Sequence, residues 1–306
     1  MQLVVTGASG FIGRNVLLRA TRDWEVPAFY HLSPDFDAFV REHGLTNVAP
    51  VRCNLLEGSE IRSLLPDRKR HVDAVLYLAA NGDPTRSVER PHFDLDANAA
   101  ALINFLEHFR VDHFVYVSSG AVYDGLVGPV SPETAVSPRL PYAISKLAAE
   151  QYVRFFAERR KTIGSYIIVR FFGAYGPLEP ARKMTTRWLK AIAAGERELV
   201  VRGDGDNLVD FVYIDDAVDG LLTLVNAKGV TATVDFGSGS PVTVNEVAER
   251  TAHALGVRVT IRHEGQTEEY IRFRSSDTTM RDRFAVTSAI TLSEGLMRLA
   301  AIVQAS

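Results

Sequence analysis

The feature that most constrains the fold is a glycine-rich loop close to the start of the chain. The apolar run Leu3-Val4-Val5 leads directly into Thr6-Gly7-Ala8-Ser9-Gly10-Phe11-Ile12-Gly13, and a helical pattern follows. This order of strand, loop and helix is the one that a dinucleotide-binding loop requires. Gly7 allows a tight turn, Gly10 lets the backbone approach a pyrophosphate, and Gly13 lets the helix pack closely on the sheet.

The helix that follows this loop would present free N–H groups and a partial positive charge to phosphate oxygens. An ordinary glycine-rich turn is the alternative, and the position of the loop directly after the first strand disfavours it. We therefore predict cofactor contacts from six loop positions: Gly7, Ser9, Gly10, Phe11, Ile12 and Gly13.

The first half of the chain alternates short β-branched runs with longer helical patterns, as in a parallel sheet covered by helices. Six candidate strands cover residues 3–5, 26–30, 48–51, 74–78, 114–117 and 166–169. Helical patterns between them include residues 93–108 and 142–159. The predicted fold class is α/β, a doubly wound parallel sheet of the Rossmann type.

The pattern becomes less regular after Gly176-Pro177. We expect residues 1–176 to form an NAD(P)-binding Rossmann domain and residues 177–306 to form mainly a smaller C-terminal substrate-binding lobe. The strand-like segments 211–214 and 234–237 are expected to return to the main sheet. The active site is expected in the cleft between the two domains.

Composition excludes several classes of protein. The 306 residues carry 34 Lys+Arg and 37 Asp+Glu, a net charge of −3, so no basic excess favours a nucleic-acid partner. The single cysteine, Cys53, cannot form an internal disulfide, and no Cys/His cluster has zinc-ligand spacing, so we predict no metal. No apolar stretch is long enough to span a bilayer, and we expect a cytoplasmic protein with no membrane partner.

Three polar residues form the candidate catalytic site. Tyr142 and Lys146 are four residues apart, which places them on one face of a helix. A nearby ammonium favours the phenolate, so we expect the Tyr142 pKa to be lowered and Tyr142 to act as acid and base. Ser119 follows closely on the apolar strand 114–117, at the carboxyl edge of the sheet where ligands bind. A packed tyrosine beside an exposed lysine is the alternative, and the loop, serine and Tyr/Lys pair in this order disfavour it.

These features together resemble the extended short-chain dehydrogenase/reductases, specifically the NAD(P)-dependent nucleotide-sugar epimerase/dehydratase group of the UDP-glucose 4-epimerase-like type. Further similarity lies in Leu78-Ala79-Ala80, Asn98, residues 170–177, residues 210–216 and Glu294-Gly295-Leu296. The resemblance implies that Ser119, Tyr142 and Lys146 are the catalytic triad and that Lys146 also binds the nicotinamide ribose. It implies that Asn98 supports the helix beneath the site.

The resemblance also assigns binding roles to other positions. Further cofactor contacts fall on His31, Asn54, Leu55, Leu78, Ala79 and Ala80, besides Tyr142 and Lys146. Substrate contacts fall on Ser119, Gly120, Tyr142 and Gly173. The second strand ends Tyr30-His31-Leu32-Ser33 with no carboxylate until Asp35, and Arg14 or His31 could contact a 2′-phosphate. The choice between NAD and NADP therefore stays open.

Departures from the family pattern limit the substrate assignment. Gly120 and Ala121 stand where dehydratases carry an Asp-Glu pair, which disfavours a 4,6-dehydratase. Gly173 stands where many relatives have asparagine, and Val209 where they have an arginine suited to a diphosphate. Four arginines of the C-terminal part could replace that arginine: Arg202, Arg272, Arg274 and Arg281.

The function predicted from these features is an NAD(P)-dependent nucleotide-sugar epimerase, a 4-epimerase in which Tyr142 acts as acid and base while a hydride is transiently removed and returned. One alternative is an NADPH-dependent keto-sugar or carbonyl reductase. Another is a non-catalytic nicotinamide-sensing regulator, which is disfavoured because Tyr142 and Lys146 are both present. The resemblance further implies a homodimer formed through the helices at 93–108 and 142–159.

Overall fold

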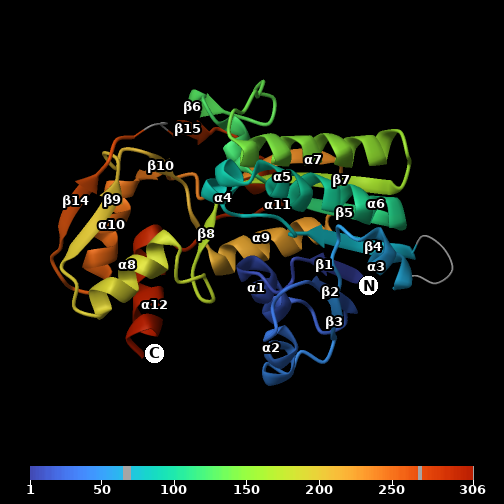
Figure 1. Cartoon of the computed structure of the whole chain (residues 1–306), viewed down its shortest axis with the longest axis horizontal. Coiled ribbons are helices and arrows are strands. Elements are labelled where there is room, and N and C mark those ends of the chain that lie inside the picture. Colours follow the sequence, from blue (N-terminus) through green and yellow to red (C-terminus); the bar gives the residue numbers. More distant parts are fainter. Residues whose placement is uncertain (65–69, 268–270, 306) are drawn as a thin grey trace. The chain divides into compact units, whose positions relative to one another are not determined.

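The computed structural model describes residues 1–64, 70–267 and 271–305. The chain forms two compact units (Figure 1). The first comprises Met1–Asp124, Val136–Phe171 and Val218–Val234, and the second comprises Gly125–Ala135, Phe172–Ala217 and Asp235–Ser306. Each unit is therefore built from three separate stretches of sequence. In the described part of the chain, no helix combines the length and the apolar character needed to cross a membrane.

A seven-stranded sheet forms the centre of the first unit, in the order β12-β7-β5-β4-β1-β2-β3. Its strands are β1 (Leu3–Thr6), β2 (Val26–Tyr30), β3 (Val48–Arg52), β4 (Arg70–Tyr77), β5 (Phe109–Ser119), β7 (Ile163–Phe171) and β12 (Ala232–Phe236). Every pairing from β3 to β7 is parallel. The predicted doubly wound parallel sheet is confirmed, and all six predicted strands are present.

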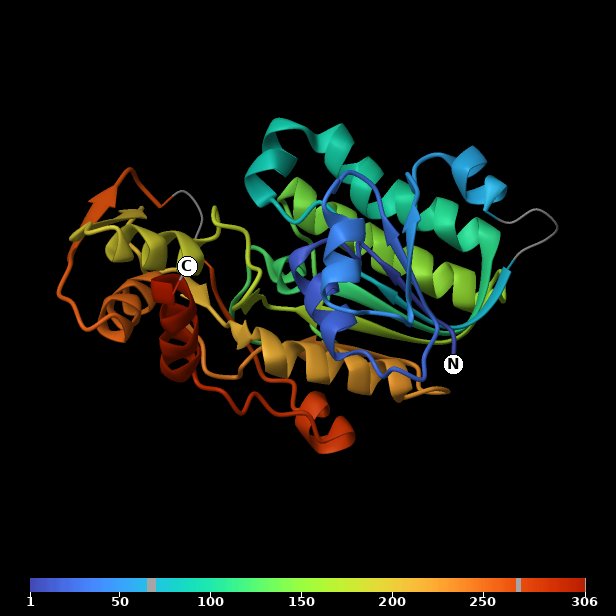
Figure 2. The ribbon, with the colours of Figure 1, turned by 90° about the horizontal axis from the view of Figure 1, so that it is seen from below.

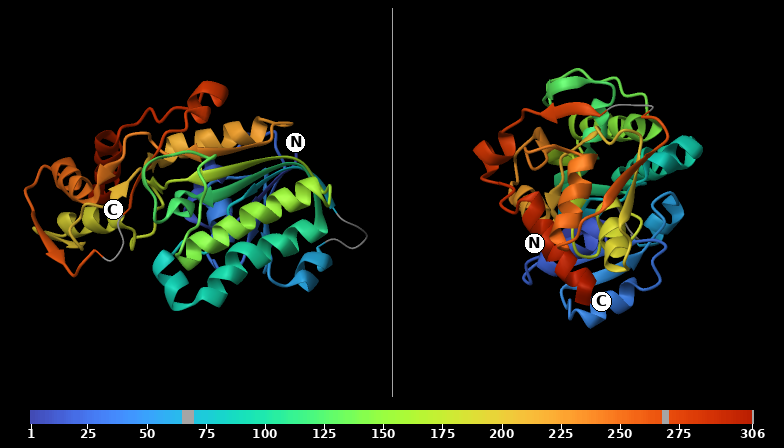
Figure 3. Two further views of the ribbon diagram at one scale, coloured as in Figure 1. Left: turned by 90° about the horizontal axis from the view of Figure 1, so that it is seen from above. Right: turned by 90° about the vertical axis from the view of Figure 1, so that its left-hand side faces the viewer.

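Helices cover both faces of this sheet. They are α1 (Phe11–Arg19), α2 (Phe36–Glu42), α3 (Gly58–Ser63), α4 (Pro84–Glu89), α5 (Pro91–Leu95), the π-helical turn η1 (Asp96–Ala100), α6 (Ala101–His108), the 3₁₀ turn η2 (Gly120–Tyr123), α7 (Pro141–Glu158) and α9 (Ile214–Asn226). Figures 1 and 3 show α6 and α7 on one face and α1 and α9 on the other. Arg19 of α1 pairs with Asp219 of α9 at 2.6 Å, so these two helices lie side by side (Figure 2).

The main core of the first unit lies between the sheet and the helices α6 and α7. Aromatic side chains dominate it: Phe105 and Phe109 stack with centroids 4.2 Å apart, and Tyr77 meets Phe105 edge-on at 5.7 Å. The central strand β5 is buried almost continuously from Phe114 onward, as expected for a parallel strand covered on both faces. This packing fixes where the strands end and so where polar groups at their carboxyl ends are placed.

The second unit is a smaller mixed α/β body with its own core. Its elements are β6 (Val127–Val130), β8 (Ala174–Tyr175), α8 (Met184–Ala193), β9 (Glu198–Arg202), β10 (Leu208–Val209), β11 (Val212–Tyr213), β13 (Val242–Thr243), α10 (Val244–Ala254), β14 (Thr260–Glu264), β15 (Arg272–Ser275), α11 (Thr279–Phe284) and α12 (Leu292–Ala305). That core includes Trp188 of α8, Leu199 of β9 and Val247 of α10. Thr243 and Glu246 form a capping box that begins α10.

The two segments expected to return to the main sheet behave differently. Residues 234–236 belong to β12, which adjoins β7 in that sheet. Residues 212–213 instead form β11, which pairs in parallel with β8, and α9 begins at Ile214. β11 has only two residues before α9 begins, so it is too short to add to the main sheet. Both segments are apolar, and the sequence does not show which of them joins that sheet.

Candidate active site

The glycine loop lies at the point where the strand order reverses. β1 pairs with β2 on one side and with β4 on the other, so the loops that leave β1 and β4 diverge there, which is where open α/β sheets bind ligands. Gly7 has φ +64°, and a Cβ on it would lie 2.8 Å from the backbone nitrogen of Ala79. The Thr6 hydroxyl accepts hydrogen bonds from the backbone of Leu78 and Ala79 at 3.1 and 3.2 Å. The two loops are therefore held together.

Gly13 is required for the helix to start where it does. A Cβ on Gly13 would lie 2.5 Å from the carbonyl oxygen of Gly7 and 2.6 Å from that of Ala8. Gly10 is the N-cap of α1, and no side chain caps this end of the helix. Uncapped N–H groups and a cradle with no room for side chains fit the pyrophosphate of a dinucleotide.

Three other predicted cofactor residues lie at the carboxyl ends of neighbouring strands. His31 is exposed immediately after β2. Asn54 and the buried Leu55 follow β3, and the Asn54 backbone N–H donates to Glu60 at 2.7 Å. The Ser9 hydroxyl of the glycine loop accepts a hydrogen bond from Ser33 at 2.9 Å. The structure thus places these residues around one edge of the sheet.

Asp35, the first carboxylate after the second strand, is linked to the glycine loop through Arg14. Arg14 donates to the carbonyl oxygen of Ser9 at 2.9 Å and to Asp35 at 2.7 Å. Its guanidinium lies over the rings of Phe36 and Phe39, which hold it against α2. Arg14 is therefore already paired with an acidic group beside the loop.

Ser119, Tyr142 and Lys146 come together at the carboxyl end of β5. Ser119 is the last residue of that strand, and its hydroxyl accepts the N–H of Ala121 at 3.1 Å, which begins η2 and buries Gly120. The side chains of Ser119 and Tyr142 are hydrogen-bonded to each other. Lys146 is 3% exposed and donates from Nζ to the carbonyl oxygen of Val117 at 2.6 Å. The structure thus brings all three predicted residues to one place.

The ionisation of Tyr142 differs from the sequence-based expectation. Burial raises the pKa of Tyr142 above its ordinary value, and the hydrogen bond from Ser119 offsets this only in part. Burial lowers the pKa of Lys146 to about 7, while the carboxylates of Glu150 and Asp94 act in the opposite direction. The expected lowering of the Tyr142 pKa is therefore absent from this arrangement, in which the Lys146 ammonium is directed to Val117.

A buried ion pair between α7 and β7 lies next to the carboxyl end of β5. Glu150, fully buried and one turn after Lys146 in α7, accepts two hydrogen bonds from Arg170 of β7 at 3.1 and 3.0 Å. Ser118 donates to the same carboxylate at 2.7 Å, and Arg170 donates to the Tyr123 hydroxyl at 3.0 Å. Glu150 was not among the residues predicted from the sequence, although its spacing of four residues from Lys146 places both on one helix face.

A second buried polar network joins Asn98 and Asp94 to Ser145, which follows Tyr142 by three residues in α7. Asn98 in the π-helical turn accepts the backbone N–H of Asn81 at 2.7 Å and donates to Asp94 and Ser145 at 3.0 and 2.8 Å. This agrees with the implied role of Asn98 in supporting the helix. Single turns of π-helix are frequent at functional sites, and this one gives Asn98 its position. Asp94 had no signal in the sequence.

The substrate-side departures have local explanations within the second unit. Gly173 has φ +133°, and a Cβ on it would lie 3.0 Å from the ring of Phe211, so a side chain there would be strained. Val209 lies in β10 and packs against the core of this unit. The candidate replacements Arg202, Arg272 and Arg274 are exposed, and Arg281 pairs with the neighbouring Asp282.

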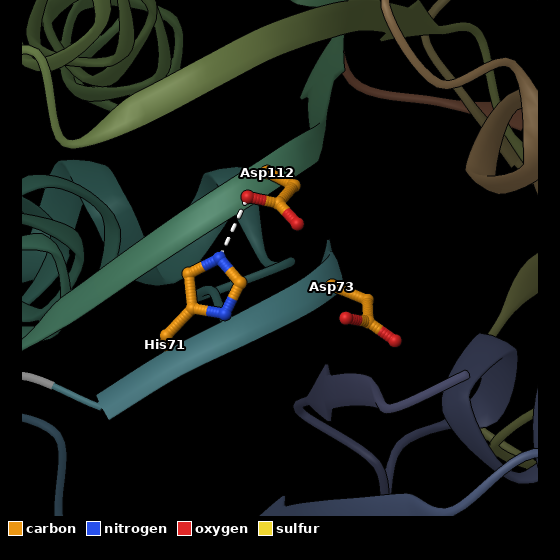
Figure 4. A group of neighbouring side chains, drawn as sticks. All are labelled: His71, Asp73 and Asp112. Carbon is orange, nitrogen blue, oxygen red and sulfur yellow. Dashed lines mark hydrogen bonds and ion pairs between the residues drawn. The ribbon is translucent and has the colours of Figure 1, made fainter.

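One group of residues has the spacing of a metal site, at the other end of the strands. Among the residues that the structure describes, His71 and Asp73 of β4 and Asp112 of β5 have ligand atoms within 4.8 Å of one another (Figure 4). His71 is hydrogen-bonded to Asp112 at 2.7 Å, and Asp73 accepts the N–H of Gln2 at 2.8 Å. These groups already have partners and lie where β4 and β5 begin, whereas Ser119 ends β5. They contribute nothing to the candidate active site.

The fold and the site define a dinucleotide-binding α/β protein with a Ser-Tyr-Lys centre. The model of the NAD dependent epimerase/dehydratase family matches residues 3–234, and the chain belongs to this family. It is 27% identical to UDP-glucose 4-epimerase of Mycolicibacterium smegmatis, with 97% of each chain covered.

Solved structures agree with this assignment. MoeE5 in complex with UDP-glucose and NAD has a TM-score of 0.84, 27% identity and 98% coverage of both chains. RMD from Pseudomonas aeruginosa complexed with NADPH has a TM-score of 0.80 and 26% identity, with coverage of 100% of this chain and 99% of the other. These relatives bind NAD in one case and NADPH in the other.

Proposed function

We propose that this protein is an NAD(P)-dependent 4-epimerase of a UDP-sugar. The observation that carries the proposal is the assembly of Ser119, Tyr142 and Lys146 at the carboxyl end of β5, in the same unit as the glycine loop. Relatives and neighbours that include a UDP-glucose 4-epimerase and a complex with UDP-glucose and NAD support the substrate class. Gly120 and Ala121 offer no acid or base for water loss, which argues against a dehydratase.

Each residue of the triad has a role that follows from its position. A bound NAD(P), held by the glycine loop and Lys146, would supply the site that accepts and returns a hydride at the sugar carbon. Tyr142 takes the proton of the sugar hydroxyl and later gives it back. Ser119, hydrogen-bonded to Tyr142, orients the same oxygen. Lys146 carries the positive charge that stabilises the phenolate and is proposed to bind the nicotinamide ribose. Once the sugar hydroxyl has regained its proton and the product has left, Tyr142 is again a phenolate and can begin another turnover.

The remaining binding roles are proposals with the same basis. Gly7, Gly10 and Gly13 leave room for a pyrophosphate at the start of α1, with Ser9, Phe11 and Ile12 as their neighbours. The segment Leu78-Ala79-Ala80 lies against that loop, and His31, Asn54 and Leu55 follow β2 and β3. Gly120 and Gly173 are proposed to contact substrate, and the C-terminal part of the chain is proposed to bind the sugar nucleotide.

A homodimer in the cytoplasm is proposed as the working form. Four apolar side chains on α5 and α7 are between 40% and 48% exposed, which suits a helix-to-helix interface: Leu95, Ile144, Tyr152 and Phe155. The buried, unpaired thiol of Cys53 suits a reducing compartment. Size-exclusion chromatography with light scattering measures the oligomeric state directly.

The experiment that tests the function is an interconversion assay with three UDP-sugars: UDP-glucose, UDP-glucuronate and UDP-N-acetylglucosamine. Each is incubated with the purified protein and NAD, and the sugar is analysed for its C4 epimer. An epimer formed without net change in cofactor absorbance supports the proposal. Stoichiometric oxidation of NADPH by a keto-sugar, with no epimer from any of the three, would contradict it and favour the reductase, which the similarity to a complex with NADPH keeps as the second candidate.

A further inference from the structure

Asp94 is a buried carboxylate that forms no ion pair with any residue the structure describes. Its side chain is 0% exposed, yet the three hydrogen bonds that it accepts all come from neutral donors. Asn81 and Asn98 donate to Oδ1 at 2.8 and 3.0 Å, and the Ser145 hydroxyl donates to Oδ2 at 2.6 Å. A buried charge is costly to leave without a counter-charge, so its presence here requires a reason beyond packing.

The network around Asp94 fixes the helix that carries the Tyr/Lys pair. Ser145 lies between Tyr142 and Lys146 in α7 and contacts both Asp94 and Asn98. Asn98 in turn accepts the backbone N–H of Asn81, just beyond Ala80 in the loop that leaves β4. Asp94 therefore connects the catalytic helix to the loop at the cofactor edge of the sheet.

The charges around Lys146 show what the carboxylate adds. The Lys146 ammonium lies 4.6 Å from the ring centroid of Tyr116 and donates to the carbonyl oxygen of Val117, both in β5. Glu150 follows one turn later in α7, but its charge is already paired with Arg170 at 3.0 Å, and Arg154 lies 3.6 Å away. Among the described residues no cation is paired with Asp94, and its negative charge acts on Lys146 in the same direction as the charge of Glu150, which has the larger effect.

Other charged groups near Asp94 face elsewhere. Arg86 and Arg90 lie over the ring of Phe93, at 3.9 and 5.4 Å from its centroid, and both are exposed. The charge of Asp94 raises the pKa values of Tyr116, Tyr142 and Lys146. The effect thus reaches both ionising members of the proposed triad.

We propose that Asp94 is a positioning residue for the reaction, which anchors α7 through Ser145 and adds a negative charge, paired with no cation of the described residues, to the surroundings of Tyr142 and Lys146. The inference rests on the proposed function, because it concerns the same site. Asp94 lies in α5, outside the segments that carry Ser119, Tyr142 and Lys146. The charge raises the pKa of both residues, so it favours the ammonium form of Lys146 and disfavours the phenolate form of Tyr142.

The variant Asp94→Asn isolates the charge from the hydrogen bonds. The remaining oxygen can still accept from Asn81 and Asn98. The new amide group can donate to the Ser145 hydroxyl, which can turn its own proton to the carbonyl oxygen of Tyr142, 3.0 Å away. The network is thus kept while the charge is lost, and Ser145→Ala makes the complementary change.

The pH dependence of kcat/KM for the epimerised UDP-sugar is the main measurement. We expect both limbs of the profile to move to lower pH in Asp94→Asn by about one unit, an order-of-magnitude value for a carboxylate in a protein interior. Ser145→Ala should lower kcat with both limbs unmoved. Asp83→Asn, which neutralises the N-cap carboxylate of nearby α4 and keeps a capping side chain, should leave the profile unchanged. An unshifted profile in Asp94→Asn overturns the proposal.

A second measurement does not depend on turnover. The absorbance of tyrosinate near 295 nm is recorded against pH for each protein and for the same protein carrying Tyr142→Phe, and the difference reports the ionisation of Tyr142. Ionisation at lower pH in Asp94→Asn supports the proposal even if no tested sugar is a substrate, and an unchanged midpoint overturns it. If Asp94→Asn does not fold, an unaltered kcat in Ser145→Ala overturns the anchoring role.

Discussion

Arg170 and Glu150 form a buried ion pair with two nearly parallel hydrogen bonds, from Nε to Oε1 at 3.1 Å and from Nη2 to Oε2 at 3.0 Å. The pair joins β7 to α7, and the Ser118 hydroxyl adds a third donor to the carboxylate. Lys146 lies one turn before Glu150 in α7. The ion pair to β7 and the hydrogen bond from Ser118 of β5 therefore fix the position of α7 along these strands, the second of which ends in Ser119. The ion pair therefore determines part of the geometry of the proposed triad.

Removing one partner of this pair should be strongly destabilising. In Arg170→Met the Glu150 carboxylate is left buried without its cation, and the free energy of unfolding should fall by about 3 to 5 kcal/mol. Urea denaturation followed by circular dichroism measures this change. The double variant Arg170→Met/Glu150→Leu should recover much of the loss, because no uncompensated charge remains. A double variant as unstable as the sum of the two single ones would contradict this explanation.

Tyr142→Phe should remove turnover and keep the cofactor site. The change deletes only the hydroxyl that is proposed to exchange protons with the substrate, so kcat should fall by about 10² to 10⁴-fold. Binding of NADH, measured by fluorescence, should stay within about twofold of the wild type, since the glycine loop is untouched. Tyr152→Phe, on the same helix and 40% exposed, is the matched control and should be fully active. Near-normal turnover in Tyr142→Phe would remove Tyr142 from the mechanism.

Gly13→Ala should abolish dinucleotide binding. The added methyl group would lie 2.5 to 2.7 Å from backbone atoms of Gly7 and Ala8, so the loop must move. Gly82→Ala is the control, because a Cβ there has no atom within 4 Å and the backbone has no positive φ. Titration calorimetry with NAD separates the two: at least a tenfold weaker affinity is expected for Gly13→Ala. Equal affinities would show that the loop does not hold the cofactor.

Asp35 should determine the preference for NAD over NADP. Arg14 is held at 2.7 Å by Asp35, beside the glycine loop, and the exposed carboxylate would repel a 2′-phosphate. Wild-type protein should bind NAD more tightly than NADP, and Asp35→Ala should improve NADP binding by about tenfold by freeing Arg14. Parallel titrations with both cofactors test this. Tighter binding of NADP by the wild type would contradict the expectation.

The sequence predicted the parts of this protein that depend on local pattern. Short apolar runs identify all six predicted strands, because the inner strands of a sheet covered on both faces need nearly continuous apolar residues. The sequence does not indicate that Asp94 meets Ser145, 51 residues away, since this contact depends on the packing of α5 against α7. The pKa of Tyr142 was also misjudged, because a four-residue spacing shows a shared helix face but not where the ammonium of Lys146 points.

Lys146 should make the stability of the protein depend on pH. Burial lowers its pKa to about 7 in the folded state from 10.5. Between these values the unfolded chain binds more protons than the folded one, so the contribution of Lys146 to stability rises with pH, by up to about 1.4 kcal/mol per pH unit. Below about pH 7 both states hold the proton, and this contribution stays constant.

The variant Lys146→Met, similar in length and uncharged, tests this sign. The free energy of unfolding is measured in urea from about pH 6 to about pH 9 for the variant and the wild type. The wild type should gain stability relative to the variant as the pH rises above about 7, because only the wild type has a lysine that must lose its proton on folding. Lys190→Met, on α8 with an exposed side chain, is the control, and its free energy of unfolding should change with pH in the same way as that of the wild type. Parallel curves for Lys146→Met as well would show that Lys146 keeps its ordinary pKa.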